Sequence, residues 1–279
     1  MKIKSIIRPI ILLVSFLIIS TVYVLNSKIQ VFPIYTLYMV FPVGAALIGV
    51  YTSRLYRFNN ANGRAMILIT GGLFCWGVSE TMAYISDNFI TSASLDPSLF
   101  DVISLLGYLA VCAGIYQGYV AAEIKLNQVN KTLLAIVSPV SIILTIVVGY
   151  FCVYQVYDPS ADFATNMVSV GFGVGDLTLL IASMLMILVA REYKGGKLAS
   201  FWKTMTAGFF IFLIADIMYY DVFGQQILAD IKPYTYNDLL WVAAYSVLAL
   251  AMLENYFHIS AVQKNIKLKL QQINNPISS

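Results

Sequence analysis

The chain has 279 residues, of which 59% are hydrophobic and only 11% are charged, and its mean hydropathy is +0.79. Soluble domains carry about 25% charged residues, so this sequence lacks the polar surface of a water-soluble fold. The composition excludes a disordered chain, a disulfide scaffold and a soluble nucleic-acid-binding protein. It predicts an all-α, polytopic membrane helix bundle that contacts the lipid bilayer.

Apolar runs of about 20 residues, the length of a membrane-spanning helix, occur eight times along the chain. The predicted helices cover approximately residues 6–25, 32–51, 65–85, 101–121, 133–154, 167–190, 201–220 and 238–257. They predict one membrane domain over residues 1–257, followed by a short basic helical tail over 258–279. We expect the first helix to be retained, because no small-x-small cleavage site follows it; cleavage would leave seven helices.

The basic residues gather in alternate connections between these helices. If the N-terminus is cytoplasmic, 15 of the 17 lysines and arginines lie inside, and only Lys28 and Lys232 lie outside. The outside connections carry acids instead, among them Asp158 and Asp162. Because cytoplasmic loops are enriched in Lys and Arg, this pattern predicts a multi-pass protein of the cell membrane with both termini in the cytoplasm.

The tail keeps a helical pattern of apolar residues among lysines and glutamines. These apolar residues are Ile259, Val262, Ile266, Leu270 and Ile273. One interpretation is that the last helix extends beyond the membrane, with its lysines at lipid headgroups. The other is that the tail docks onto a cytoplasmic or membrane protein partner, or dimerises.

Two parts of the chain resemble each other, which indicates an internal repeat. Residues 71–84 align with residues 207–220 at an offset of 136, and the following helices align at an offset of 137. The matched pairs are Glu80 with Asp216, Met82 with Met218, Tyr84 with Tyr220, Asp101 with Asp238, and Tyr108 with Tyr245. Gly44 and Gly175 match more loosely, at an offset of 131.

Helices two, three and four are therefore expected to recur as helices six, seven and eight. The halves cover about residues 1–131 and 132–257. Four helices separate the equivalents, and because this number is even the two copies share one orientation. The prediction is a parallel 4+4 repeat whose axis runs along the membrane normal.

Three acidic residues stand out inside the predicted spanning helices, away from the first and last turns, namely Glu80, Asp176 and Asp216. Inserting each into a membrane costs roughly 2.5–3.5 kcal/mol, so each needs a compensating role. No lysine, arginine or histidine lies in the predicted membrane interior to pair with them. The acids must then be protonated, bonded to neutral partners, hydrated, or available to a cationic ligand.

Aromatic residues accompany these acids. Trp76, Glu80 and Tyr84 recur every four residues and share one helix face. A cavity open to the outside and lined by carboxylates and aromatic rings suits a small cationic ligand. The alternative is that tyrosine hydroxyls satisfy the acids in a purely structural role. The predicted ligand-binding residues are Glu80, Asp216, Asp176, Trp76, Tyr84, Tyr220 and Trp241.

Asp101 and Asp238 have a simpler explanation than ligand binding. Each is the last residue of an S/T-x-x-D motif, beginning at Ser98 and Thr235, before an apolar run. This is the capping-box pattern, and a carboxylate there also complements the helix dipole. We expect both acids to cap helices.

The sequence carries no signature of an enzyme, a metal site or a cofactor. The three cysteines lie singly in apolar runs, and the one histidine, His258, follows the last predicted span. Gly114 and Gly118, and the G-x-G-x-G run beginning at Gly171, are typical of helix packing faces. No strand precedes that run, so it does not indicate a nucleotide site.

Short motifs recur on successive helices of the second half. They are G-D-L at 175–177, A-D-x-x-Y at 215–219 and D-x-x-W-x-x-x-Y at 238–245. Over about residues 170–253 they resemble the multi-pass membrane sensor regions that precede diguanylate cyclases and sensor histidine kinases. The resemblance implies a sensing or binding bundle. The given sequence shows no counterpart of their effector domain, so we expect the output to lie in a separate partner.

Three functions remain open at this point. The first is an integral membrane sensor that binds a small ligand, cation or proton from outside, with Glu80 and Asp216 as the paired acids, and signals through helix eight. The second is a small-solute or ion transporter, because parallel repeats with intramembrane carboxylates also build alternating access. The third is a structural subunit of a membrane complex.

Overall fold

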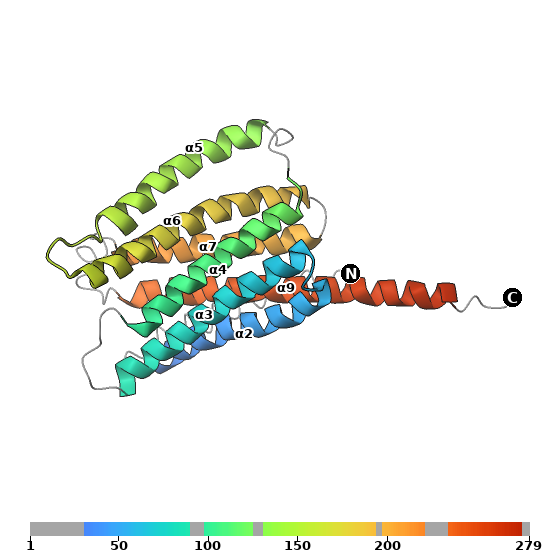
Figure 1. The fold of residues 1–279 in the computed structure, drawn as a ribbon, viewed down its shortest axis with the longest axis horizontal. Coiled ribbons are helices and arrows are strands. Elements are labelled where there is room, and N and C mark those ends of the chain that lie inside the picture. The colour runs from blue at the N-terminus through green and yellow to red at the C-terminus, as the bar shows by residue number, and fades with distance from the viewer. Residues whose placement is uncertain (1–30, 90–97, 125–130, 194–196, 221–233, 275–279) are drawn as a thin grey trace.

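The computed structural model describes residues 31–89, 98–124, 131–193, 197–220 and 234–274. Within these ranges the chain is helical throughout its regular structure and contains no strand (Figure 1). The elements are α2 (Val31–Tyr56), α3 (Ala61–Phe89), α4 (Leu99–Ala121), α5 (Lys131–Val148), the π-helical η2 (Gly149–Tyr154), α6 (Phe163–Glu192), α7 (Lys197–Tyr220) and α9 (Tyr234–Asn274).

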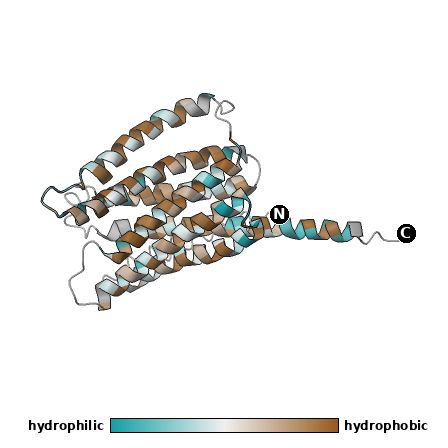
Figure 2. Cartoon of the chain, in the orientation of Figure 1, coloured by the Kyte–Doolittle hydropathy of each residue, from teal (hydrophilic) through white to brown (hydrophobic). Residues whose placement is uncertain are grey.

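Seven helices of the described chain are long and apolar enough to cross a membrane, with α5 and η2 counted as one span. The prediction of an all-α, multi-pass bundle is confirmed at this level. Hydrophobic residues cover the flanks of the bundle, and hydrophilic residues gather at helix ends and along the last turns of α9 (Figure 2). The first predicted helix, residues 6–25, lies outside the described residues, so the count of eight stays a prediction.

A tight connection makes α2 and α3 antiparallel neighbours. Arg57 ends α2 in the left-handed conformation, with φ 66°. The Oδ1 atom of Asn60 then accepts a hydrogen bond from the Gly63 backbone nitrogen at 2.6 Å, which caps the first turn of α3. Gly63 is needed there, because a Cβ atom would collide with the Arg57 carbonyl.

Helix caps explain where α4 and α6 begin. At α4 the Ser98 nitrogen donates to Asp101 Oδ2 at 2.8 Å and the Asp101 nitrogen donates to Ser98 Oγ at 3.4 Å. The predicted capping role of Asp101 is thus confirmed. Asp162 caps α6, which begins four residues before the predicted start. The side chain of Asp238 lies outside the described residues, so its capping role stays a prediction.

Six helices form a closed ring in which each packs against two ring neighbours. The order round the ring is α2, α3, α4, α6, α7, α9 and back to α2. The α5 helix lies outside this ring, against α6 (Figure 1), and most of its described side chains are exposed. The ring places α4 beside α6 and α2 beside α9.

Glycines allow these helices to approach closely. A Cβ atom added at Gly114 on α4 would lie 2.8 Å from a backbone nitrogen of α3, and one at Gly175 on α6 would lie 2.9 Å from the Tyr108 ring. At Gly173 it would collide with the Cys152 carbonyl of η2. The predicted role of these glycine runs as packing faces is confirmed.

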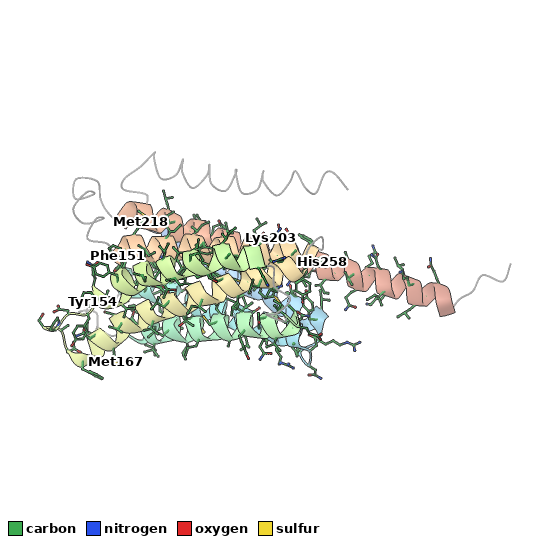
Figure 3. All side chains as sticks on the ribbon, turned by 90° about the horizontal axis from the view of Figure 1, so that it is seen from above. Phe151, Tyr154, Met167, Lys203, Met218 and His258 are labelled. Atoms are coloured by element: carbon green, nitrogen blue, oxygen red, sulfur yellow. The ribbon has the colours of Figure 1, made fainter. Side chains whose placement is uncertain are left out.

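The α9 helix continues past the ring at one end (Figure 1). Just beyond the ring, Gln263 Nε2 donates to the Leu55 carbonyl of α2 at 3.1 Å. His258 and Lys203 lie at this end of the bundle, whereas Tyr154 lies at the opposite end (Figure 3). One continuous helix is therefore both a member of the ring and the segment that projects from it.

Candidate functional site

Two of the predicted acids lie close together, on α6 and α7. The Tyr108 hydroxyl of α4 donates to Asp176 Oδ1 at 2.8 Å and lies 3.5 Å from Asp216 Oδ2. Asp176 is only 1% exposed and Asp216 only 7%. One tyrosine thus bridges two buried carboxyl groups from different helices, which we call the Asp176–Asp216 pair.

The Asp176–Asp216 pair lacks one hydrogen-bond donor. The two carboxyl groups lie on either side of the Tyr108 hydroxyl, each within 3.5 Å of it. Among the described residues, however, no group donates to the buried Oδ2 of Asp176. Two carboxylates cannot donate to each other, and like charges in an apolar interior repel strongly. A proton or a cation between the two groups would satisfy the orphan oxygen and remove the repulsion.

Asp216 is also tied to α9. The Trp241 indole Nε1 donates to Asp216 Oδ1 at 2.8 Å. The Tyr219 ring packs against that indole, with the ring centroids 5.5 Å apart. The side chains around the pair therefore come from four helices, α4, α6, α7 and α9.

Glu80 has a different partner. This side chain is half-buried on α3, and its Oε1 atom accepts from the Tyr245 hydroxyl of α9 at 3.0 Å. We expected Glu80 and Asp216 to be the paired acids. In the structure the tyrosine bridge joins Asp216 to Asp176 instead, and Glu80 forms a second acid–tyrosine contact.

An aromatic cluster connects these two acidic positions; it consists of Trp76, Tyr108, Phe212 and Tyr245. Trp76 stacks on Phe212, with centroids 5.0 Å apart and an interplanar angle of 10°. The Tyr108 ring meets Trp76 edge-on at 5.2 Å, and the Tyr245 ring meets Phe212 edge-on at 5.7 Å. The cluster is buried, so it fixes the two tyrosine hydroxyls in place.

The predicted site residues are not all part of this arrangement. The contacts above bring together Glu80, Asp176, Asp216, Trp76 and Trp241. Tyr84 is half-buried and packs edge-on against Phe89, at the end of α3, with centroids 6.1 Å apart. The side chain of Tyr220 lies outside the described residues.

Three residues of the arrangement were missed as site residues: Tyr108, Tyr245 and Phe212. Both tyrosines were visible in the sequence as matched positions of the repeat. Each half of the repeat contains one matched acid and one matched tyrosine. This coincidence is the signal that would have identified the two tyrosines. Phe212 is the repeat equivalent of Trp76, but by itself a phenylalanine in an apolar helix is indistinguishable from a core residue.

A second buried polar cluster lies further along α9. Glu254 is 8% exposed, and its Oε2 atom accepts from the Ser200 hydroxyl at 3.0 Å. The neighbouring Asn255 accepts from the Tyr56 hydroxyl at 2.9 Å and donates to the Met66 sulfur at 3.1 Å. Sequence reasoning overlooked Glu254, because it lies near the end of the last predicted span.

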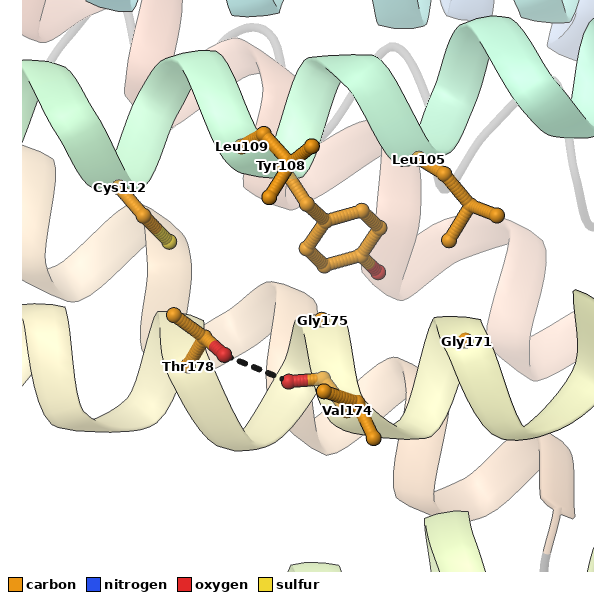
Figure 4. A pocket seen from close by; sticks show the side chains of 8 residues that line it. All are labelled: Leu105, Tyr108, Leu109, Cys112, Gly171, Val174, Gly175 and Thr178. Carbon is orange, nitrogen blue, oxygen red and sulfur yellow. Dashed lines mark hydrogen bonds between the residues drawn. The ribbon is translucent and has the colours of Figure 1, made fainter.

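A crevice of about 170 Å³ lies between α4 and α6 (Figure 4). It is lined by Leu105, Tyr108, Leu109, Cys112, Gly171, Val174, Gly175 and Thr178. The Thr178 hydroxyl donates to the Val174 carbonyl at 2.7 Å, so it presents no free donor to the crevice. The Tyr108 ring forms part of the wall, and its hydroxyl reaches the Asp176–Asp216 pair.

Metal chemistry and relatives give no further guide to function. In the part of the chain that the structure describes, no group of three or more His, Cys, Asp or Glu side chains is placed to hold a metal ion. No protein-family model, curated protein or solved structure matches the chain. Functional inference therefore rests on the residues of the site.

Proposed function

We propose that the chain is an integral membrane sensor or binding protein that takes a proton or a small cation, from the external side of the cell membrane, at the Asp176–Asp216 pair. The observation that carries this proposal is the buried Asp176 Oδ2 atom without a donor, beside a second carboxyl group. Such an atom costs free energy, and acids inside membranes most often serve function. Glu80 is the second acidic group of the site.

The partners of the pair suggest how binding is communicated. A proton or cation on the carboxyl groups weakens the hydrogen bonds that they accept from Tyr108 and Trp241, because carboxylates are the stronger acceptors. Trp241 belongs to α9, the helix that continues past the ring. A change at Asp216 therefore acts directly on the segment proposed to contact a cytoplasmic or membrane protein partner.

We also propose that the ring is a parallel repeat of α2–α3–α4 and α6–α7–α9. The order of packing supports this, because the α4–α6 and α9–α2 contacts are equivalent under such a repeat. So do the acid–tyrosine contacts. Glu80 with Tyr245, and Asp216 with Tyr108, are equivalent pairs at offsets of 136 and 137.

Further contacts recur in the same register. Trp76 stacks on Phe212, its own equivalent, as residues beside a two-fold axis do. Two other sets of equivalent contacts are Gly72 with Val111 and Gly208 with Leu248, and Gly118 with Trp202 and Asn255 with Met66. Compositional resemblance between apolar helices does not account for contacts that match pair by pair.

The register between α2 and α6 is better described by an offset of 134 than by 131. At 134 the exposed Val40 and Leu47 match the exposed Val174 and Ile181. The same offset matches Tyr38 with Phe172, and their rings meet the equivalent tyrosines of α9 and α4, each at 6.3 Å. The loose match of Gly44 with Gly175 is therefore replaced.

Acid-to-amide variants test the proposed function. In lipid nanodiscs, we expect intrinsic tryptophan fluorescence to change with pH or with added methylammonium, because Trp241 bonds directly to Asp216. Asp176→Asn and Asp216→Asn each should abolish most of this response, and Glu80→Gln should shift it. All three variants should remain folded by size-exclusion chromatography.

Glu254→Gln is the matched control, because Glu254 is another buried acid of the bundle but bonds to Ser200 rather than to the pair. It should leave the response intact. An unchanged response in both Asp variants would overturn the proposal. The same proteins in sealed vesicles test the transporter alternative, which is favoured by the contact of the pair, in the second proposed half, with Tyr108 of the first. A sensor binds the cation without moving it across the membrane.

A further inference from the structure

The crevice between α4 and α6 breaks the symmetry of the proposed repeat. At the offset of 134, its two lining glycines, Gly171 and Gly175, correspond to Leu37 and Phe41 of α2. Both of these larger side chains pack against the core. At the equivalent positions α2 therefore carries two large side chains, whereas α6 carries none; the Tyr108 ring lies against Gly175, and the crevice lies beside Gly171 and Gly175.

The buried acid is specific to the same side. At that offset Asp176 corresponds to Pro42 of α2, whose side chain has no charge and no hydrogen-bonding group. Tyr108 joins the two features, because its ring lines the crevice and its hydroxyl donates to Asp176. The crevice and the unsatisfied carboxyl oxygen thus occur together at the α4–α6 contact. At the equivalent positions of the α9–α2 contact, neither is present.

The crevice opens toward the surface that faces lipid in a membrane-spanning bundle. Leu109 and Val174 line it and are 67% and 49% exposed. An apolar cavity of 150 Å³ holds benzene, so about 170 Å³ accommodates roughly a six-carbon segment of a chain. The remaining length of a longer chain would lie along the exposed flank between α4 and α6.

We propose that this crevice binds the alkyl part of a membrane-soluble amine, whose ammonium group bonds to the Asp176–Asp216 pair. The inference rests on the proposed function and names its ligand class. Two adjacent carboxyl groups sharing one proton carry a single negative charge, which one ammonium group neutralises. Ammonium also supplies several donors, and one of these satisfies the Oδ2 of Asp176.

The test uses dodecylamine with a photoreactive diazirine in its chain, and the matched dodecanol probe without charge. In nanodiscs the amine probe should cross-link to residues 105–112 and 171–178, as mapped by mass spectrometry, about tenfold more than the alcohol. Gly171→Leu, which introduces the residue found at the equivalent position of α2, should lower this labelling about tenfold. Leu105 is the nearest neighbour and its side-chain end can yield.

Gly44→Leu is the matched control, because a side chain there meets nothing within 4 Å; it should leave labelling unchanged. Thr178→Met, which narrows the crevice from its exposed side, replaces Gly171→Leu should that variant fail to fold. Asp176→Asn should reduce amine labelling to the level of the alcohol.

Two results would overturn the inference: equal labelling by amine and alcohol, or labelling that persists in the crevice-filling variant. Either would leave the proposed function standing if the Asp variants still abolish the response to pH or methylammonium. A third result also bears on the inference. If one site binds the amine and senses the cation, an Asp variant that loses the response should not keep normal amine labelling. Such a variant would separate the crevice from the sensing function and contradict the inference as well.

Discussion

Tyr108 connects the crevice, the aromatic cluster and the Asp176–Asp216 pair. Its ring lines the crevice and packs against Trp76, and its hydroxyl lies 2.8 Å from Asp176 and 3.5 Å from Asp216. Gly175 makes this position possible, because any Cβ atom there would press on the ring. The geometry of the two carboxyl groups therefore depends on one side chain from a third helix.

Removing this hydroxyl should destabilise the bundle. Tyr108→Phe deprives Asp176 of the donor to its Oδ1 atom, while its Oδ2 atom already has none. Leaving a buried acceptor unsatisfied costs roughly 1–3 kcal/mol. We therefore expect a lower free energy of unfolding, measured by denaturant titration in detergent micelles.

Tyr245→Phe is the control that the proposed repeat provides. It removes the equivalent hydroxyl, but the acceptor Glu80 is half-buried, so water can replace the lost donor. The loss of stability should be clearly smaller than for Tyr108→Phe. Equal losses of stability in the two variants would contradict this prediction. They would show that the Tyr108 hydroxyl matters no more to its buried acids than the Tyr245 hydroxyl does to Glu80.

At the scale of the element, the start of α6 is set by charge. Asp162 Oδ1 accepts from the backbone nitrogens of Ala164 and Thr165, at 2.8 and 3.0 Å. Hydrogen bonds from Thr165 and from these nitrogens hold the pKa of Asp162 below its usual value of 3.8. In the same turn, bonds from Ser160 lower the pKa of Asp158.

The sign of the pH effect follows from this direction. A lowered pKa means that the folded turn favours the carboxylate, so its stabilisation is complete above pH 3.8 and is lost as pH falls further. Hydrogen exchange at Ala164 and Thr165, corrected for intrinsic rates, should accelerate only below that pH. Asp162→Asn, which accepts without titrating, should remove the pH dependence; acceleration beginning near about pH 6 would contradict the assignment.

The elements themselves were largely predictable, because each spanning helix is a local property of the sequence. The predicted and observed ends of α7 agree at Tyr220, and the capping box at Ser98 was read directly. The start of α6 was predicted too late, at residue 167, because the search for apolar runs leaves out the polar first turn that Asp162 caps. The π-helical turns of η2 were also missed, since their packing against Gly173 is a tertiary contact.

At the scale of the whole molecule, sequence reasoning found the buried acids but expected Glu80 beside Asp216 and did not foresee that Tyr108 bridges Asp216 to Asp176. Scarcity of charge in an apolar chain identifies Asp176 and Asp216 individually. Their contact depends on the closure of the ring, which brings Tyr108 across 68 residues to Asp176. No local periodicity contains that information. The paired tyrosines of the repeat were the one sequence signal that pointed to it.

Charge differs between the two ends of the bundle. Arg57 and Arg64 flank the α2–α3 connection, at the end from which α9 projects, whereas Asp158 and Asp162 flank the turn between η2 and α6. Because Lys and Arg are retained on the cytoplasmic side, the first end is proposed to face the cytoplasm. The two connections that the structure describes in full, α2–α3 and η2–α6, then lie on opposite sides.

Single cysteines test this orientation. With Cys75, Cys112 and Cys152 replaced by alanine, Ser160→Cys should react with a membrane-impermeant maleimide on intact cells. Asn59→Cys, exposed in the α2–α3 connection, should react only after permeabilisation. The reversed pattern would place α9's projecting segment outside the cell. Signalling to a cytoplasmic partner through α9 would then be impossible, whereas the hydrogen bonds of the Asp176–Asp216 pair would be unaffected, so orientation and site chemistry are separable.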